Sequence, residues 1–222
     1  MYLEFNQTVQ EMYFAQFDIT ENGSKVGQAS IQGWLGGEQG NWTVNYRGRT
    51  IFISPIQDRE FNKVHPNVFR TWRPQVIKNG NKDGVIIGYH YQEYENQGLL
   101  KNLFGNEKIH LMMEIDSEVY ESFGVNPSLD EGGKMCIYDA NNRLVSIGGV
   151  PHDIYDGMRN YQIISSDEKY VLPTIIQICR AYAVSGFNPG QKIKKGHQVI
   201  SVYTKDEELR SKYDPAFEIK YR

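Results

Sequence analysis

The segment richest in ligand-binding chemistry is His65–Pro74, HPNVFRTWRP, in which Arg70 and Arg73 flank Trp72. A guanidinium group binds an anionic headgroup through charge and paired hydrogen bonds, and an indole ring adds a flat face for stacking. In the alternative, Trp72 belongs to the core and the arginines are its solvated neighbours. Successive side chains of a strand point to opposite faces, so this arrangement needs no binding function to explain it. These three residues form the first candidate binding group.

A second basic group occurs in QKIKKGHQ, where Lys192, Lys194 and Lys195 follow an apolar, helix-like segment. Lysines in this position bind phosphate groups, and they also interact favourably with the C-terminus of a preceding helix. A solvated loop is the commoner role of such a run. The three lysines are the remaining candidate ligand-binding residues.

Metal-binding residue types are grouped only at His152, Asp153 and Asp156. The five histidines include no pair four residues apart, the spacing that places two metal ligands on one helix face. A solvated polar loop explains the group better, because metal ligands need a second shell that fixes them. The sequence therefore predicts no metal and no cofactor.

Nucleophilic and phosphate-binding motifs are also missing from the sequence. Cys136 falls in a predicted strand and Cys179 in a predicted helix, and buried thiols in apolar surroundings are inert. The glycine-rich stretch Gly33–Gly40 lacks the Lys-Ser/Thr pair of a P-loop. These features favour a protein that is not an enzyme.

Composition indicates one globular domain over residues 1–222. The chain is 40% hydrophobic and 13% aromatic, which is enough for a sizeable core, and no Pro- or Gly/Ser-rich linker divides it. The formal net charge of -3 disfavours bulk affinity for nucleic acid, which normally requires a basic domain or stripe. Two cysteines are too few for a disulfide framework and are typical of a reducing compartment.

Two observations bear on location. The N-terminus lacks the basic and apolar regions of a secretory signal. The longest apolar run, Val171–Val184, contains Pro173, Gln177 and Arg180 and is shorter than the roughly 20 residues that span a bilayer. We therefore expect a cytoplasmic protein without a transmembrane segment.

Short apolar or alternating segments separated by turn residues predict eleven or twelve strands. The two clearest hairpin turns are Asn22-Gly23 and Asn141-Asn142, because these residues adopt the positive φ angles of tight turns. The expected strands are Glu11–Ile19, Lys25–Gly33, Trp42–Arg47, Thr50–Ser54, Val68–Trp72, Val85–Tyr94, Lys108–Ile115, Lys134–Tyr138, Leu144–Val150, Val199–Tyr203 and Ala216–Lys220.

The segment Tyr170–Phe187 predicts a helix that is apolar nearly all round and must be enclosed by protein. Its preferred start is Pro173, where a missing N–H costs nothing, and a start capped by Ser165 is the alternative. Gly186 is the expected stop. Arg180 should pair with a strand carboxylate or extend to a barrel mouth, since a buried charge needs a partner. A second, surface helix is expected at Asp206–Tyr213.

The hairpin pattern IYDANNRLVSIGGV, the many short strands and the single apolar helix VLPTIIQICRAYAVSGF resemble the tubby C-terminal-like superfamily, which includes tubby domains, phospholipid scramblases and LURP-one-related proteins. The resemblance implies a mainly β fold, with a closed antiparallel barrel of about twelve strands around a central hydrophobic helix. It covers essentially the whole chain, although this chain continues for some 35 residues beyond the helix. No ligand motif of the family matches residue by residue.

Three function classes remain. The first is a non-enzymatic binding module for an anionic lipid headgroup or a protein partner. The second is an enzyme whose site lies in strand-end loops, with His152 and nearby carboxylates as acid and base. The third is a structural or assembly protein, which a large exposed apolar patch would favour.

Overall fold

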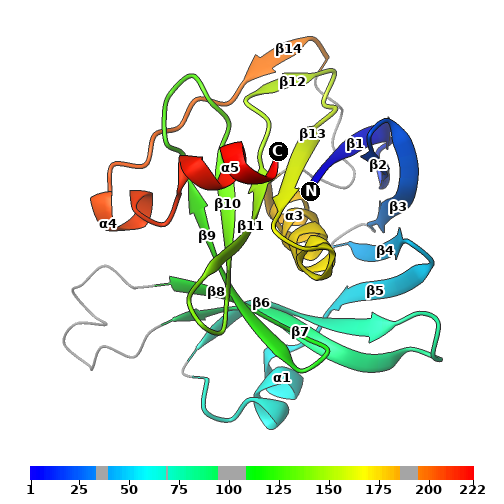
Figure 1. Ribbon diagram of the computed structural model, residues 1–222. Helices are drawn as coiled ribbons and strands as arrows, with labels where there is room; N and C mark the ends of the chain where they lie inside the picture. The colour runs from blue at the N-terminus through cyan, green and yellow to red at the C-terminus, as the bar shows by residue number, and fades with distance from the viewer. Residues whose placement is uncertain (34–39, 69, 95–108, 186–194) are drawn as a thin grey trace.

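Twelve antiparallel strands close into a barrel in the computed structural model, which describes residues 1–33, 40–68, 70–94, 109–185 and 195–222 (Figure 1). Closure leaves no unpaired edge. The mainly β prediction is therefore confirmed. In barrel order the strands are β1 (Tyr2–Gln10), β13 (Asn160–Ser165), β11 (Leu144–Gly149), β10 (Lys134–Asp139), β9 (Glu118–Val125), β8 (Ile109–Ile115), β7 (Val85–Tyr94), β6 (Thr71–Asn79), β5 (Arg49–Pro55), β4 (Asn41–Tyr46), β3 (Ser24–Gln32) and β2 (Phe14–Glu21), which returns to β1.

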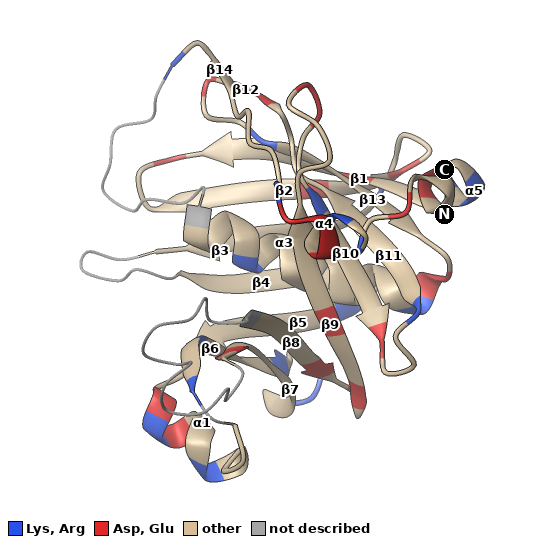
Figure 2. Ribbon diagram, turned by 90° about the vertical axis from the view of Figure 1, so that its left-hand side faces the viewer, with Lys and Arg blue, Asp and Glu red and all other residues tan. Residues whose placement is uncertain are grey.

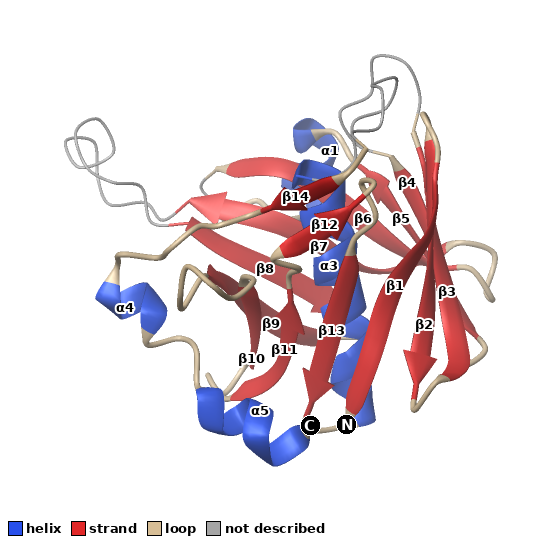
Figure 3. Cartoon of the chain, turned by 90° about the horizontal axis from the view of Figure 1, so that it is seen from above, coloured by secondary structure: helices blue, strands red, loops and turns tan. Residues whose placement is uncertain are grey.

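The helix α3 (Val171–Ser185) lies inside this barrel, as the view from above shows (Figure 3). Its first ten residues are all buried, so the apolar surface predicted to need enclosure is enclosed by the strands. The barrel around a central hydrophobic helix is the architecture expected from the sequence.

Every second side chain along a strand faces the interior of the barrel, and these side chains line the lumen. On β5, Ile51 and Ile53 are buried while Phe52 between them faces outward. Aromatic side chains fill the space beside the helix: the ring of Tyr182 on α3 makes edge contacts with the rings of Phe17 and Trp42, at centroid distances of 4.9 and 5.9 Å. The lumen is thus a packed core.

Polar contacts attach the first half of α3 to the barrel wall. The hydroxyl of Thr174 donates to Ser146 Oγ on β11 at 2.7 Å, and Ser146 donates to the carbonyl of Ile164 on β13 at 3.0 Å. Gly148 allows the helix to approach β11, because a Cβ at this position would lie 3.3 Å from Thr174 Cγ2. These contacts fix the helix against one side of the barrel.

Short elements cover the outside of the barrel. They are α1 (Asp58–Val64), α4 (Glu207–Arg210), α5 (Pro215–Tyr221) and a two-stranded sheet of β12 (Asp153–Tyr155) and β14 (His197–Val199). From α1, the ring of Phe61 packs on Tyr91, 4.8 Å between centroids, so the outer face of β7 is also covered. Charged residues of both signs are spread over the molecule, as on α1 (Figure 2).

The strand predicted at Ala216–Lys220 is wrong, because this segment forms α5. Asp214 caps the helix by accepting from the backbone N–H of Ala216, and Pro215 occupies the first helical turn, where it needs no N–H partner. Phe217 then packs on the outer-wall residue Cys136 and its neighbours. The capping signal Asp-Pro outweighs a short apolar alternation here.

Other strand boundaries also differ from the predictions. The sequence did not indicate β1, β9, β12 or β13, and it placed a strand at Val68–Trp72, whereas β6 begins only at Thr71. The predicted strand Val199–Tyr203 overlaps β14 only at Val199. The two hairpins were predicted correctly, with Asn22 at φ 50° and Asn142 at φ 56°.

The central helix begins earlier than predicted. A 3₁₀ helix, η1 (Glu168–Tyr170), capped by Asp167, leads directly into α3 at Val171. Pro173 therefore sits in the first turn and not at its first position, which is tolerated because the first-turn N–H groups lack acceptors within the α-helix. The expected stop, Gly186, lies outside the described residues. The short helix α4 is capped by Asp206 as predicted, but it ends at Arg210.

Both cysteines are free and buried. Cys136 packs beneath α5 on the outer wall, whereas Cys179 belongs to the core around α3. Burial raises the pKa of both thiols, that of Cys136 to about 12. This environment is the inert one that the sequence predicted.

In the described part of the chain, no helix is long and apolar enough to cross a membrane.

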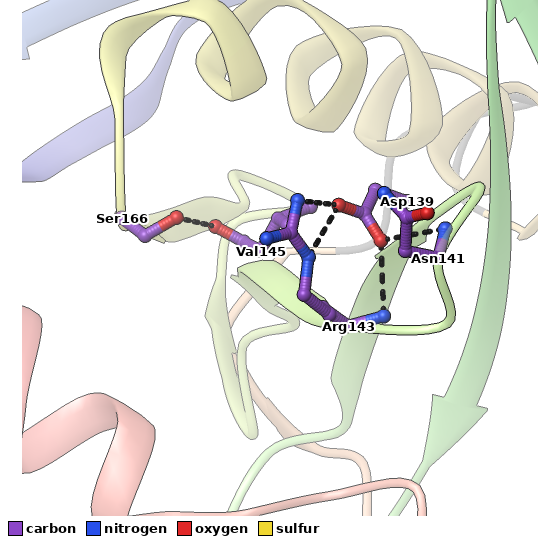
Figure 4. A network of polar contacts seen from close by, with 5 residues as sticks. All are labelled: Asp139, Asn141, Arg143, Val145 and Ser166. Carbon is purple, nitrogen blue, oxygen red and sulfur yellow. Dashed lines mark hydrogen bonds and ion pairs between the residues drawn. The ribbon is translucent and has the colours of Figure 1, made fainter.

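The turn between β10 and β11 is held by one carboxylate, as Figure 4 shows. Asp139 accepts from the backbone N–H groups of Asn141 and Arg143, each at 3.0 Å, and from the Arg143 guanidinium at 2.6 and 2.9 Å. The Arg143 contact is the main cause that lowers the pKa of Asp139 below its ordinary value of 3.8. The carboxylate thus stabilises a turn that needs a left-handed Asn142.

We expect Asp139→Ala to lower the free energy of unfolding by about 1–2 kcal/mol, chiefly through loss of the hydrogen bonds to two backbone N–H groups of the turn. Because the folded pKa of Asp139 lies below the unfolded one, this charge contributes fully above the unfolded pKa and its contribution is lost as the pH falls through the folded pKa. Urea unfolding of both proteins at several pH values measures the difference. Exposed Asp130→Ala is the control and should change little; an equal loss in both variants would contradict the role of Asp139.

Candidate functional site

The start of β6 contains an irregularity beside the predicted Arg–Trp residues. Register with β7 shifts between Trp72 and Gln75, and Arg73 has φ 50° directly before Pro74. Such a left-handed conformation is unfavourable for a side-chain-bearing residue, and a following proline disfavours helical conformations further. Strained backbone of this kind is typical of functional sites.

Arg180 holds this bulge from inside the barrel. Its guanidinium donates to the carbonyl of Arg73 at 2.7 Å and to that of Trp72 at 3.0 Å. The side chain is only 4% exposed, and burial lowers its pKa to about 10, so it remains charged at neutral pH. The expected carboxylate partner is not found among the described residues; backbone carbonyls take its place.

Outside the bulge, four residues form what we call the arginine–tryptophan edge: Arg70, Trp72, Arg73 and Tyr94. The guanidinium carbon of Arg73 lies 4.3 Å from the centre of the Trp72 ring, and that of Arg70 lies 3.9 Å from the Tyr94 ring. Trp72 is 38% exposed, and Arg70 is exposed as well. Trp72 therefore does not belong to the core, and the three predicted residues are brought together.

Inside the bulge, four other residues form what we call the lumen polar cluster: Gln75, His90, Gln177 and Arg180. Gln75 on β6 and His90 on β7 are direct register partners, and both are fully buried. Gln177 and Arg180 lie three residues apart on α3, hence on one helix face, and both influence the pKa of His90. One strand pair and the central helix thus converge on a single polar point.

This cluster contains buried polar atoms that no described residue satisfies. They are both ring nitrogens of His90 and the Oε1 atoms of Gln75 and Gln177. Leaving one such atom unpaired costs about 1–3 kcal/mol, and folded proteins rarely tolerate several together.

Electrostatics make the cluster positive. Burial is the main cause that lowers the pKa of His90 well below its ordinary value, the neighbouring Arg180 charge lowers it further, and a weak contact with the Gln177 side chain offsets a part of this shift. His90 is therefore neutral at physiological pH, with one ring nitrogen donating and the other accepting. Arg180 supplies the charge within the cluster, and the Arg73 charge nearby lowers the pKa of Arg180.

Of the second predicted basic patch, the structure describes only Lys195, which does not lie beside the first patch. Lys195 is exposed just before β14, which pairs with β12 in the connection between β11 and β13. β11 is five strands from β6 in the barrel order, so Lys195 and the arginine–tryptophan edge are on different sides of the barrel. Lys192 and Lys194 lie outside the described residues.

The group at His152 forms a clasp between distant segments. Asp153 contacts His152 Nδ1 at 3.1 Å and His197 Nε2 on β14 at 2.6 Å, and Asp156 accepts from the backbone N–H of Gly196. These contacts fix β14 against β12. Over the described ranges, no three His, Cys, Asp or Glu side chains are arranged to hold a metal ion.

Among the hollows formed by the described residues, two lie beside charged side chains elsewhere on the barrel. A groove of about 500 Å³ runs between α5 and the outer wall, bordered by His152 and crossed by the Lys134–Glu218 ion pair. A hollow of about 340 Å³ lies beside the start of α3, where Arg49 pairs with Asp116. Both mix the two signs of charge, so neither selects an ion of one sign.

Sequence reasoning identified Arg70, Trp72 and Arg73 but not Gln75 and His90. Alternation along Val85–Tyr94 placed His90 on one strand face without showing which face was inward, since both faces of β7 are covered. The sequence signal for Gln75 and His90 is that each is a polar residue on a strand that also contains many apolar residues.

Comparison with models of known protein families, with curated proteins and with solved structures finds no match to this chain. Its class is therefore defined by the fold alone, a closed twelve-stranded antiparallel barrel with a helix inside it.

Proposed function

We propose that this protein is a non-enzymatic binding module of the tubby-like type, and that its ligand is an anionic membrane lipid bound at the arginine–tryptophan edge. The tubby-like assignment draws on the helix-filled barrel. The observation that carries the ligand is an exposed tryptophan beside two arginines, Arg70 and Arg73, on one strand end.

The chemistry of the edge suits a membrane surface. Arginine binds phosphate and carboxylate groups through paired hydrogen bonds, and tryptophan is favoured where one end of the ring is apolar and the other is wet. Stacking on Trp72 and Tyr94 preorganises both guanidinium groups. The contacts from Arg180 hold the backbone between them, so the edge is presented by a rigid support.

We expect the protein to co-sediment with vesicles that contain phosphatidylserine and not with phosphatidylcholine vesicles. Arg73→Ala or Arg70→Ala should each weaken binding about 5-fold, since a basic residue near an anionic surface contributes about 1 kcal/mol. Trp72→Ala should weaken binding by a similar factor, and salt should reduce the binding of the wild type.

The controls are matched in exposure and chemistry. Phe52 on β5 is 37% exposed, like Trp72, and Arg49 is a half-buried arginine, like Arg73, and is paired with Asp116. Phe52→Ala and Arg49→Ala should leave vesicle binding unchanged. Absence of binding to any anionic vesicle would overturn the lipid proposal, and equal losses in edge and control variants would overturn the location of the site.

A further inference from the structure

The lumen polar cluster does not touch the proposed membrane ligand, because its side chains face the interior of the barrel, although Arg180 supports the backbone of the edge. Gln75, His90 and Gln177 are each at least 95% buried, and together they present four polar atoms without a partner in the described part of the chain. Apolar side chains at these positions would avoid this defect at no loss of packing. Something that is polar and small must therefore complete the cluster.

Charge narrows the class of occupant. The cluster holds the positive charge of Arg180, and none of the described carboxylates forms an ion pair with it. The Arg73 guanidinium is close enough to lower the pKa of Arg180 further, so the local charge is uncompensated and positive. A buried charge is stabilised by an opposite charge and hydrogen bonds. An anion is therefore the class of occupant that this charge favours.

The hydrogen-bonding capacity of the cluster narrows the class of occupant further. Two carbonyl contacts use two of the five N–H groups of Arg180, which leaves N–H groups for a planar, bidentate acceptor such as a carboxylate. Neutral His90 offers one donor and one acceptor, and the Oε1 atoms of Gln75 and Gln177 require donors. An occupant that carries both a carboxylate and a hydroxyl group satisfies all of these.

We propose that the lumen polar cluster is a binding site for a small monocarboxylate that also bears a hydrogen-bond donor, such as a 2-hydroxy acid. The carboxylate lies against Arg180 and the donor end lies between the two glutamine amides. This proposal concerns a different ligand from the membrane proposal and the opposite face of the β6 bulge, and Arg180 is the residue that the two have in common.

Thermal unfolding and titration calorimetry with glycolate and lactate test the proposal, with glycolamide and lactamide as uncharged analogues. We expect the carboxylates to raise the Tm by several degrees at saturation, as a ligand specific to the native state does, and the amides to leave it unchanged. No shift with any of the carboxylates would overturn the proposal and leave water as the occupant.

Variants locate the site. Gln177→Leu and Gln75→Leu remove an unpartnered amide without opening a cavity, so both should fold and should lose the ligand-induced shift. Gln16→Leu, the same change on the outer face of β2, should keep the shift. If Gln177→Leu retains the full shift, the carboxylate binds elsewhere and the assignment is wrong.

An NMR readout does not depend on stability. Addition of glycolate should move the imidazole nitrogen resonances of His90, identified by their absence in His90→Gln, and should leave those of exposed His197 in place. Unmoved His90 resonances in a protein that binds glycolate would also overturn the assignment.

Discussion

Tyr182→Ala is expected to lower the free energy of unfolding by about 3–5 kcal/mol, the usual cost of removing a large aromatic side chain from a core. Tyr182 is fully buried at the point where α3 meets β1, β2 and β4. Its ring packs edge-on against Phe17 and Trp42. Its hydroxyl contacts Gln7 Nε2 at 3.0 Å and Gln10 Oε1 at 2.6 Å.

Two further variants separate packing from hydrogen bonding at this position. Tyr182→Phe keeps the ring and should lose about 1–2 kcal/mol, because the hydrogen bonds of the hydroxyl to Gln7 and Gln10 are then lost. Val184→Ala, two residues on and 40% exposed, should change the free energy of unfolding by less than about 0.5 kcal/mol. Chemical denaturation followed by tryptophan fluorescence measures all three, and a Tyr182→Ala protein as stable as Val184→Ala would contradict a helix packed in the lumen.

The sequence was sufficient to predict the architecture because one physical constraint dominates it. A helix that is apolar nearly all round cannot face water, and in a chain of short strands the strands are the only material that can enclose it. That argument does not depend on exact boundaries. It therefore held although β1, β9 and β13 were not predicted as strands.

Competing local signals explain why the sequence did not predict α5 and β9. Ala216–Lys220 alternates like a strand, but Asp214 and Pro215 start a helix whose Phe217 covers the outer wall. The strand β9, with Val119, Tyr120 and Phe123 among glutamates, lacks a clean alternation. Propensity in a short window is a weak signal, and tertiary packing decides such cases.

The candidate site was predictable only on its outer side. Arg70, Trp72 and Arg73 are adjacent in sequence, so their types alone drew attention to them. The inner side required the register of β6 with β7, which a one-residue slip would reverse, and the rotation of α3 that directs Gln177 and Arg180 toward His90. The spacing of residues within one strand or one helix does not show how that element is placed against its neighbours.

Arg180 joins the two sides, which gives its replacement the second large expected effect. Arg180→Met should lower the free energy of unfolding by about 2–4 kcal/mol. The variant leaves the buried carbonyls of Trp72 and Arg73 without donors, each worth about 1–3 kcal/mol, while loss of the buried charge offsets part of the cost. Arg180→Lys keeps a charge but lacks the planar fork, so it should lose an intermediate amount.

A double-mutant cycle with Arg73→Gly tests whether Arg180 acts through the strained bulge. Glycine accepts φ 50° without penalty, so Arg73→Gly alone should stabilise the wild type by about 0.5–1 kcal/mol while weakening vesicle binding through the lost charge. If Arg180 holds the left-handed residue in place, the same change should recover more stability in the Arg180→Met background than in the wild type. Equal effects of Arg73→Gly in both backgrounds would show that Arg180 stabilises the lumen without controlling the bulge, and the rigid support proposed for the arginine–tryptophan edge would then be lost.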